Sequence, residues 1–179
     1  MNNQIVLQRA ETKRLILCKC KVSEFDKHFR DIFAKEMEEV LQESELREVN
    51  YGNDFIDYLK KKRGEQICFY WLIKLGTQRD VIGFIRTDYS ERVDSLRIRF
   101  AMRSVWRNKG YMKEALGAII SFYMDTIKVN RMEAFLSSSN EIARNLLEQS
   151  GFLVEGIMRQ AIWENGMITD LYVYGMLRD

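Results

Sequence analysis

The sequence predicts a single mixed α/β domain, and three observations favour that class. β-rich runs alternate with segments in which apolar residues recur at helical spacing. An Asn165-Gly166 pair between two β-rich runs near the end of the chain marks a hairpin. No linker, internal repeat or low-complexity stretch divides the 179 residues. We therefore expect residues 1–179 to form one domain.

The first third of the chain is expected to hold one strand and several helices. Residues 15–17, Leu-Ile-Leu, predict the opening strand, and Ser23 is a suitable N-cap for the helix that comes next. The apolar positions of that helix are Phe25, Phe29, Ile32 and Phe33. Residues 36–48 predict a charged helix, and residues 53–64 predict a third helix that ends at a glycine. The mixed charges across residues 35–63 indicate a solvated face, with a mobile cover over a binding cleft as the alternative.

The remainder of the chain is rich in β-forming residues. The expected strands cover residues 67–75, 81–89, 94–102, 131–137, 152–163 and 168–177. Turns join the first two and the last two of these strands as hairpins. Two helices interrupt the strands. The first has one apolar face, made of Ala115, Leu116, Ile119, Ile120, Tyr123 and Ile127. The second covers residues 140–150, with Asn140 as N-cap and Gly151 after its end.

Residues 107–112, Arg-Asn-Lys-Gly-Tyr-Met, are the most informative segment, because they link an expected strand to the long amphipathic helix. A helix start leaves several backbone N–H groups unpaired, and the helix dipole places partial positive charge there. Such a turn is suited to a phosphate or pyrophosphate. Arg107 and Lys109 add formal positive charge, and Gly110 lets the backbone approach the ligand closely. The alternative is an ordinary turn with two solvated cations.

The same turn is not the phosphate loop of a nucleotide triphosphatase. The lysine precedes the only glycine, and no Ser or Thr comes after it to hold a magnesium ion. The spacing is not that of a dinucleotide fingerprint either. The turn therefore predicts an anion site alone.

The composition of the chain argues against several classes of partner, catalytic mechanism and metal site. A formal net charge of +2 gives no general attraction for nucleic acid, and no apolar stretch approaches the ~20 residues of a membrane span. Residues 1–6 lack the basic and apolar regions of a secretory signal. His28 is the only histidine, which excludes Ser-His-Asp and Cys-His catalysis and zinc sites with several imidazoles. Cys18, Cys20 and Cys68 fit neither a disulfide framework nor a metal site, so we expect reduced thiols, no bound metal and a cytoplasmic protein.

A second motif lies at residues 140–152, Asn-Glu-Ile-Ala-Arg-Asn-Leu-Leu-Glu-Gln-Ser-Gly-Phe. Together with Arg-x-x-Gly at residues 107–110 and Lys-Glu-Ala-Leu at residues 113–116, it resembles the GNAT superfamily of N-acetyltransferases. More narrowly, the chain resembles the branch that includes ribosomal-protein N-terminal alanine and serine acetyltransferases. Residues 12–17, Thr-Lys-Arg-Leu-Ile-Leu, resemble the opening strand of that branch, and residues 81–85, Val-Ile-Gly-Phe-Ile, its third strand. The resemblance extends over nearly the whole chain.

The resemblance implies an architecture and a donor. The expected fold is a mostly antiparallel sheet of about seven strands, flanked by helices, with a central parallel pair that splays apart. Residues 96–102 and 131–137 form that pair, and acetyl-coenzyme A lies in the gap between them. The anion turn agrees with this independently, because open α/β sheets place ligands at the carboxyl ends of their strands.

The resemblance also implies which residues hold the coenzyme. Backbone N–H groups of residues 108–113 bind the pyrophosphate, and main-chain groups of residues 100–102 pair with the pantetheine amide and polarise the thioester carbonyl. Asn140 hydrogen-bonds the pantetheine arm and can serve as the N-cap as well. The expected coenzyme-binding residues are Phe100, Ala101, Met102, Arg107, Asn108, Lys109, Gly110, Tyr111, Met112, Lys113 and Asn140. Met112 stands where the family usually has a small residue, so its side chain has to point away from the pyrophosphate.

Acetyl transfer to an amine needs a base, because the ammonium form cannot attack a thioester. Glu133 is the candidate, since relatives carry a glutamate at this place in the strand and its neighbours Met132 and Ala134 point to the other side. A solvent-facing strand glutamate is the alternative. The general acid is left open, because some relatives have a serine where this chain has Ala143. The substitutes considered are Ser137, Ser138, Ser139 and Tyr174, or a thiolate that leaves unprotonated.

The leading hypothesis is therefore transfer of an acetyl group from acetyl-coenzyme A to a primary amine, by direct attack on the thioester. The amine is either a protein N-terminus or a small molecule. The alternatives are an inactive coenzyme A-binding regulatory module with the same fold and a nucleotide-phosphate-binding protein. We expect a monomer or a homodimer, without a nucleic-acid or membrane partner. The acceptor stays open, because its pocket is expected to be built from the helices of residues 24–63.

Overall fold

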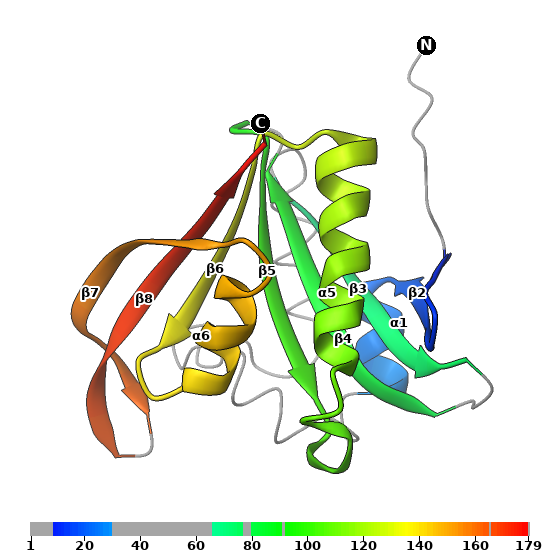
Figure 1. Cartoon of the computed structure of the whole chain (residues 1–179), viewed down its shortest axis with the longest axis horizontal. Coiled ribbons are helices and arrows are strands. Elements are labelled where there is room, and N and C mark those ends of the chain that lie inside the picture. The colour runs from blue at the N-terminus through cyan, green and yellow to red at the C-terminus, as the bar shows by residue number, and fades with distance from the viewer. Residues whose placement is uncertain (1–8, 30–65, 77–79, 91, 165, 179) are drawn as a thin grey trace.

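A computed structural model describes residues 9–29, 66–76, 80–90, 92–164 and 166–178, drawn in colour in Figure 1. Their strands form one mixed sheet in the order β1-β2-β3-β4-β5-β6-β8-β7. All neighbouring strands pair antiparallel except β5 and β6, which are parallel. The expected fold class, with its central parallel pair, is confirmed. The helices expected over residues 36–48 and 53–64 lie outside the described residues.

The elements lie close to where the sequence predicted them. The strands are β1 (Arg9–Glu11), β2 (Leu15–Cys20), β3 (Gln66–Leu75), β4 (Val81–Ser90), β5 (Ser95–Met102), β6 (Arg131–Ser137), β7 (Leu153–Glu164) and β8 (Met167–Leu177). The described helices are α1 (Val22–His28), α5 (Tyr111–Ser121) and α6 (Glu141–Glu148), with a 3-10 turn η1 (Ser104–Trp106) and a π-helical turn η2 (Phe122–Ile127) on either side of α5. Every strand expected from the sequence is present, with its ends within three residues of the prediction. The strand beyond the expected seven is the short edge strand β1, which pairs with β2.

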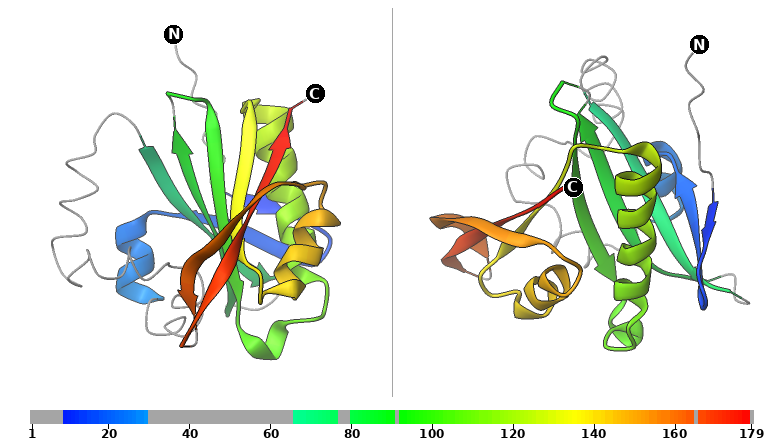
Figure 2. Two further views of the ribbon diagram at one scale, coloured as in Figure 1. Left: turned by 90° about the vertical axis from the view of Figure 1, so that its left-hand side faces the viewer. Right: turned by 45° about the horizontal axis from the view of Figure 1, so that its top comes forward.

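The two faces of the sheet carry separate hydrophobic cores. Figure 2 shows α5 and α6 on one side of the sheet and α1 on the other. The larger core contains Trp71 and Leu116, and the smaller core contains Tyr70, Phe84 and Phe25. Successive strand residues such as Tyr70 and Trp71 enter opposite cores because strand side chains alternate between faces. The Phe25 ring of α1 stacks on the Tyr70 ring, with centroids 3.9 Å apart, and so fixes α1 against the sheet.

α1 begins two residues earlier than the sequence predicted. Ser23, the expected N-cap, lies inside the helix, and Lys21 occupies the N-cap position. The Glu24 carboxylate accepts a hydrogen bond from the backbone N–H of Lys21 at 3.2 Å. That bond satisfies a donor that the helix start would otherwise leave unpaired. The prediction of Ser23 as the N-cap is wrong, because the Glu24 carboxylate, three residues after the N-cap, accepts the hydrogen bond at the helix start.

α5 has the predicted apolar face along most of its length. Ala115, Leu116 and Ile119 are fully buried, and Tyr123 is 7% exposed. Ile127, expected on the same face, is 38% exposed. The helix passes into the π-helical turn η2, whose wider turns change the angular position of the residues after it. The prediction for Ile127 fails because the helical period changes before it.

β5 and β6 are joined over a short length only. Their register consists of Ser95↔Arg131, Leu96↔Met132 and Arg97↔Glu133. Beyond these three pairs β5 continues along β4, while β6 continues along β8. The two strands therefore diverge toward their carboxyl ends, as Figure 1 shows, and the splayed pair implied by the resemblance is present.

Two glycines, one in a tight contact with β5 and one with open space around it, allow a test of the packing between β4 and β5. A Cβ on Gly83 of β4 would lie 2.7 Å from the carbonyl oxygen of Ala101, whereas a Cβ on Gly117 of α5 would meet nothing within 4 Å. We expect Gly83→Ala to lower the free energy of unfolding by about 1–3 kcal/mol, because backbone has to move. We expect Gly117→Ala to raise it by about 0.5–1 kcal/mol through helix propensity. Urea unfolding measures both, and a Gly83→Ala protein as stable as wild type would contradict the close contact between β4 and β5.

Candidate functional site

The anion turn joins the end of β5 to the start of α5, beside the diverging strands (Figure 1). Two of its residues have left-handed backbone, Asn108 with φ 60° and Gly110 with φ 74°. Asparagine tolerates this region better than most residues, and glycine adopts it without strain. The residue types at these two positions therefore suit the path by which the chain enters the helix.

The turn presents unpaired main-chain donors. In the part of the chain that the structure describes, the N–H groups of residues 108–113 have no hydrogen-bond acceptor. The first paired amide is that of Glu114, which donates to the carbonyl oxygen of Gly110 at 3.1 Å. Left-handed residues just before a helix start form a concavity of N–H groups that binds anions, and the helix dipole adds to the attraction. The geometry thus supports an anion site at the predicted place.

The cationic side chains of the turn are each engaged with protein atoms. Arg107 Nε donates to the carbonyl oxygen of Met102 at 2.8 Å. Lys109 Nζ lies 4.8 Å from the centroid of the indole ring in η1. Lys113 Nζ donates to Gln149 Oε1 at 3.1 Å and so links α5 to the end of α6. All three charges stay beside the turn, where they favour an anion electrostatically.

Met112 packs into the larger core and is 9% exposed. Its side chain therefore lies among apolar neighbours and not among the unpaired donors. Tyr111, the first residue of α5, is half-buried and packs against the same core. The departure from the family pattern at position 112 leaves the main chain of the turn unobstructed.

Phe100, Ala101 and Met102 form the end of β5 on one side of the split. They pair with β4, and the described register contains no pair between them and β6. Their other edge therefore carries main-chain groups that a ligand can pair with, apart from the carbonyl of Met102, which accepts from Arg107.

Asn140 lies on the other side of the split, at the start of α6. Its Oδ1 accepts a hydrogen bond from the N–H of Ala143 at 3.2 Å, so the expected N-cap is present. Within the described residues the side-chain amide of Asn140 donates to no acceptor, and the residue is exposed. Asn140 therefore caps the helix and still offers an N–H donor.

Glu133 lies at the last β5–β6 pair, on the sheet face opposite Met132 and Ala134, which belong to the larger core. Its Oε1 accepts from Arg97 Nε at 2.9 Å, and its Oε2 lies 3.6 Å from Arg131 Nε. The Glu133 side chain is 19% exposed. Two arginines thus hold this carboxylate at the point where the strands separate.

The serines considered as a general acid form a hydroxyl cluster at the end of β6. Ser137 and Ser139 both donate to Glu164 Oε2, at 2.6 and 2.5 Å. Ser138 and Ser137 contact Thr169 Oγ1 at 3.0 and 3.1 Å. Each serine hydroxyl is thus engaged with a neighbouring side chain at the open end of the split.

Tyr174, the other candidate acid, is fully buried. Its hydroxyl donates to Glu148 Oε1 at 2.8 Å. Burial, together with that carboxylate, raises the pKa of Tyr174 to about 12. A phenol with this pKa keeps its proton at neutral pH. Ala143 is buried and offers no polar side chain.

A side-chain network that the sequence did not predict connects the turn to the start of β2. Glu114 accepts hydrogen bonds from Thr12 Oγ1 at 2.5 Å, from Arg14 N at 2.8 Å and from Arg14 Nε at 2.6 Å. Arg14 Nη1 also donates to the carbonyl oxygen of Lys109 at 3.0 Å, and its guanidinium carbon lies 4.6 Å from the centroid of the Tyr111 ring. Thr12, Arg14 and Glu114 all belong to motifs that carried the family resemblance. Their sequence spacing gave no sign that they touch.

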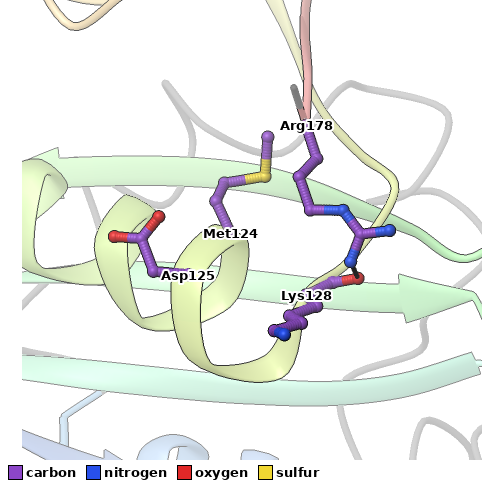
Figure 3. Close-up of a pocket in the computed structure, with 4 residues that line it drawn as sticks. All are labelled: Met124, Asp125, Lys128 and Arg178. Carbon is purple, nitrogen blue, oxygen red and sulfur yellow. Dashed lines mark hydrogen bonds between the residues drawn. The ribbon is translucent and has the colours of Figure 1, made fainter.

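A surface pocket lies at the opposite end of the α5–η2 helix from the anion turn. It is lined by Met124, Asp125, Lys128 and Arg178 (Figure 3). Arg178 Nη1 donates to the carbonyl oxygen of Lys128 at 2.5 Å, which ties the end of the chain to the end of η2. None of the residues predicted for the site lines this pocket, and we assign it to the junction between η2 and β8.

The three cysteines are free thiols in the structure. Cys18, Cys20 and Cys68 form no disulfide. Burial raises the pKa of Cys20 to about 11 and that of Cys68 to about 12, so both stay protonated at neutral pH. Across residues 9–29, 66–76, 80–90, 92–164 and 166–178, no three His, Cys, Asp or Glu side chains come together as metal ligands. No helix described in those ranges is both long and apolar enough to span a bilayer.

Comparison with protein families decides the classification. The acetyltransferase (GNAT) domain matches residues 14–153. The chain belongs to this acetyltransferase family. The matched residues contain β5, the anion turn, β6 and the start of α6, and with them every residue predicted for the site. The family predicted from the motifs is confirmed.

Individual relatives differ in how much they match. The uncharacterised N-acetyltransferase YoaA of Bacillus subtilis (strain 168) is 32% identical over 73 residues, which cover 41% of this chain and 41% of that protein. The matches to curated relatives span 40% to 61% of the relatives' own lengths. These partial matches leave the activity of the whole protein to be proposed.

Two solved structures share the fold. The ribosomal L7/L12 alpha-N-protein acetyltransferase RimL, in complex with coenzyme A, has a TM-score of 0.73 at 18% identity and covers 94% of this chain and 96% of its own. The dodecameric spermidine N-acetyltransferase from Vibrio cholerae has a TM-score of 0.74 at 15% identity and covers 93% of this chain and 95% of its own. At these identities the likeness establishes a common GNAT fold.

The hydrogen bonds on Glu114 predict a pH-dependent contribution to stability. Burial alone would raise the pKa of Glu114, but hydrogen bonds from Thr12 and Arg14 outweigh it and lower the pKa. A carboxyl with a lowered folded-state pKa stabilises the fold above its unfolded pKa of about 4.3, and this stabilisation is lost as the pH falls through the folded pKa. We expect Glu114→Gln to lower the free energy of unfolding by about 1–3 kcal/mol at neutral pH.

The difference between wild type and Glu114→Gln should shrink from about pH 6 to about pH 3, because the wild-type carboxylate becomes protonated. Urea titrations of both proteins across this range measure the difference. A difference that stays constant with pH would contradict the assigned network.

Proposed function

We propose that the protein transfers an acetyl group from acetyl-coenzyme A to a primary amine, either a protein N-terminus or a small-molecule amine. The observation that carries the proposal is the divergence of β5 and β6 after three pairs, with unpaired main-chain donors beside the end of β5. Membership of the GNAT family supports it, as does the shared fold of RimL in complex with coenzyme A. In this proposal residues 1–179 act as one catalytic domain in the cytoplasm.

The coenzyme occupies the split. Its pyrophosphate accepts hydrogen bonds from the N–H groups of residues 108–113, supported by the charges of Arg107 and Lys109. Its pantetheine arm pairs with the free edge of residues 100–102, in the place where β6 has turned away from β5. The Asn140 amide donates to the same arm from the other side. The ligand thereby provides the partner that the edge of β5 lacks beyond Arg97.

The chemistry is a direct attack. The amine nitrogen bonds to the thioester carbonyl carbon while the π electron pair moves to the oxygen, where main-chain N–H groups of β5 stabilise it. The electron pair then returns, the C–S bond breaks and coenzyme A leaves as its thiolate, while the nitrogen, which is cationic after the attack, loses its second proton to solvent water and becomes the neutral amide. Glu133 accepts the proton that the ammonium loses, through a bridging water, because Arg97 and Arg131 already contact its carboxylate. Ala143 supplies no acid, and a thiolate leaves without one.

The fold does not select the acceptor. RimL is described as an alpha-N-protein acetyltransferase and its Vibrio cholerae neighbour as a spermidine N-acetyltransferase, yet both share this sheet. Acceptor identity therefore has to be determined with a panel of amines.

Gly110→Asp and Gly110→Asn form a matched pair that tests coenzyme binding. Both side chains have nearly the same shape and tolerate left-handed backbone, so they share the strain at φ 74°. Only aspartate adds a negative charge to the turn, at a position whose Cβ would lie 3.4 Å from Arg14 Nη2. We expect Gly110→Asp to weaken coenzyme A binding by about 100-fold or more and Gly110→Asn by about tenfold or less. Isothermal titration calorimetry gives both affinities, and equal affinities would contradict a pyrophosphate at this turn.

Acetyl transfer is tested by thiol release with peptides, polyamines, aminoglycosides and amino sugars as acceptors. We expect amine-dependent release for at least one class, and a loss of about 10²–10⁴ in kcat for Glu133→Gln because the variant cannot accept a proton. Coenzyme A affinity should stay unchanged in that variant. Glu11→Gln, at the far edge of the sheet in β1, is the matched control and should behave as wild type.

Two outcomes would count against these assignments. Saturable coenzyme A binding without turnover for any amine would favour the inactive regulatory module. An unchanged pH–rate profile in Glu133→Gln would remove Glu133 as the base while leaving acetyl transfer in place.

A further inference from the structure

We propose that Arg14 is a positioning residue for the coenzyme, which sets the orientation of the main chain in the anion turn. The inference rests on the proposed function and deepens it. Arg14 precedes β2 and lies 95 residues before Lys109 in the chain, yet its Nη1 donates to the Lys109 carbonyl oxygen at 3.0 Å. Arg14 acts through the backbone of the turn and makes no contact with the reacting atoms.

The bond to the Lys109 carbonyl constrains a donor on the opposite side of the same peptide. The peptide between Lys109 and Gly110 is trans and planar, so its C=O and N–H groups point in opposite directions. A guanidinium that holds the carbonyl oxygen on one side therefore keeps the N–H of Gly110 directed to the other. That N–H is one of the unpaired donors assigned to the pyrophosphate. Glycine at φ 74° is conformationally permissive, so the peptide needs such an external constraint.

Arg14 is itself held in place by Glu114 and by the Tyr111 ring. Its Nε and its backbone N–H donate to the two oxygens of Glu114, at 2.6 and 2.8 Å, and Thr12 Oγ1 donates to the same carboxylate at 2.5 Å. The guanidinium carbon lies 4.6 Å from the centroid of the Tyr111 ring. Because Glu114 and Tyr111 belong to the first turn of α5, the network fixes Arg14 relative to the helix whose start binds the anion.

Three different roles for Arg14 would give different results on substitution. A positioning role needs the planar fork, because one guanidinium bonds Glu114 and the Lys109 carbonyl at once. A role as a remote positive charge needs only the charge, which lysine retains. A role in global stability would impair binding of every substrate, although the bonds from Thr12 Oγ1 and the Arg14 backbone N–H to Glu114 survive substitution of the Arg14 side chain.

The test compares Arg14→Ala and Arg14→Lys with wild type and with Arg9→Ala. Arg9 is a suitable control, because it lies on neighbouring β1 and forms an exposed ion pair with Glu11 at 2.7 Å. Two probes are used with each protein. Coenzyme A contains the pyrophosphate, and S-acetyl-pantetheine has the same thioester and arm without it.

We expect Arg14→Ala and Arg14→Lys each to raise the Kd of coenzyme A by about tenfold, the effect of losing one or two hydrogen bonds to a charged group. The kcat/KM for S-acetyl-pantetheine should stay at the wild-type value in both variants, since that substrate does not use the turn. It also shows that the variants are folded. Arg9→Ala should match wild type with both probes.

Each other result has a defined meaning. Unchanged coenzyme A affinity in Arg14→Ala, with normal binding in wild type, would overturn the inference and leave the proposed function intact. Wild-type affinity in Arg14→Lys alone would overturn it in favour of a simple charge effect. Equal losses for coenzyme A and S-acetyl-pantetheine would overturn it in favour of a general structural role. A wild-type protein that does not bind coenzyme A would instead refute the proposed function.

Discussion

Three residue pairs between β5 and β6 hold the two halves of the sheet together, and the split beyond them exists because this junction is so short. β5 pairs with β4 along its whole length, and β6 pairs with β8. Beyond Arg97 and Glu133, β5 and β6 no longer pair with each other. Main-chain polar groups in the interior of a sheet are normally paired, and an interrupted edge creates a place for a ligand that can pair with it. The helices α5 and α6 start at the open end of this interruption and bring their unpaired N-terminal groups to the same region.

The site combines main-chain donors with side chains that shape the main chain. Arg107 reaches back to the carbonyl of Met102, Lys113 bridges to α6, and Arg14 grips the turn from the start of β2. These contacts join separate parts of the chain. They fix the relative positions of the last residues of β5, the turn and the two helices. The face of the sheet away from α5 and α6 carries the ion pair of Arg97 and Glu133. The two faces of the sheet therefore differ in chemistry beside the split.

The fold and the position of the turn before α5 could be predicted because their signals are local. Alternating β-rich runs, the Asn-Gly hairpin and the apolar face of α5 each depend on residues close in sequence, and each was placed within three residues. Contacts between distant residues had no such signal. The sequence showed Arg14 and Glu114 in separate motifs, and only the fold brings these residues together across 100 positions. Ile127 was misplaced because the change to π-helical geometry in η2 is not encoded in a 3.6-residue period.

Met112 illustrates a consequence of a turn that presents main-chain donors rather than side chains. Because its thioether lies in the core, a large side chain at this position leaves the unpaired N–H groups of the turn unobstructed. The size of residue 112 is therefore limited by the volume that it shares beneath α5 with Trp71 and Leu116, and not by chemistry at the turn. A consensus pattern that demands glycine or alanine here would pass over chains of this kind, although they retain the geometry that the pattern was written to detect.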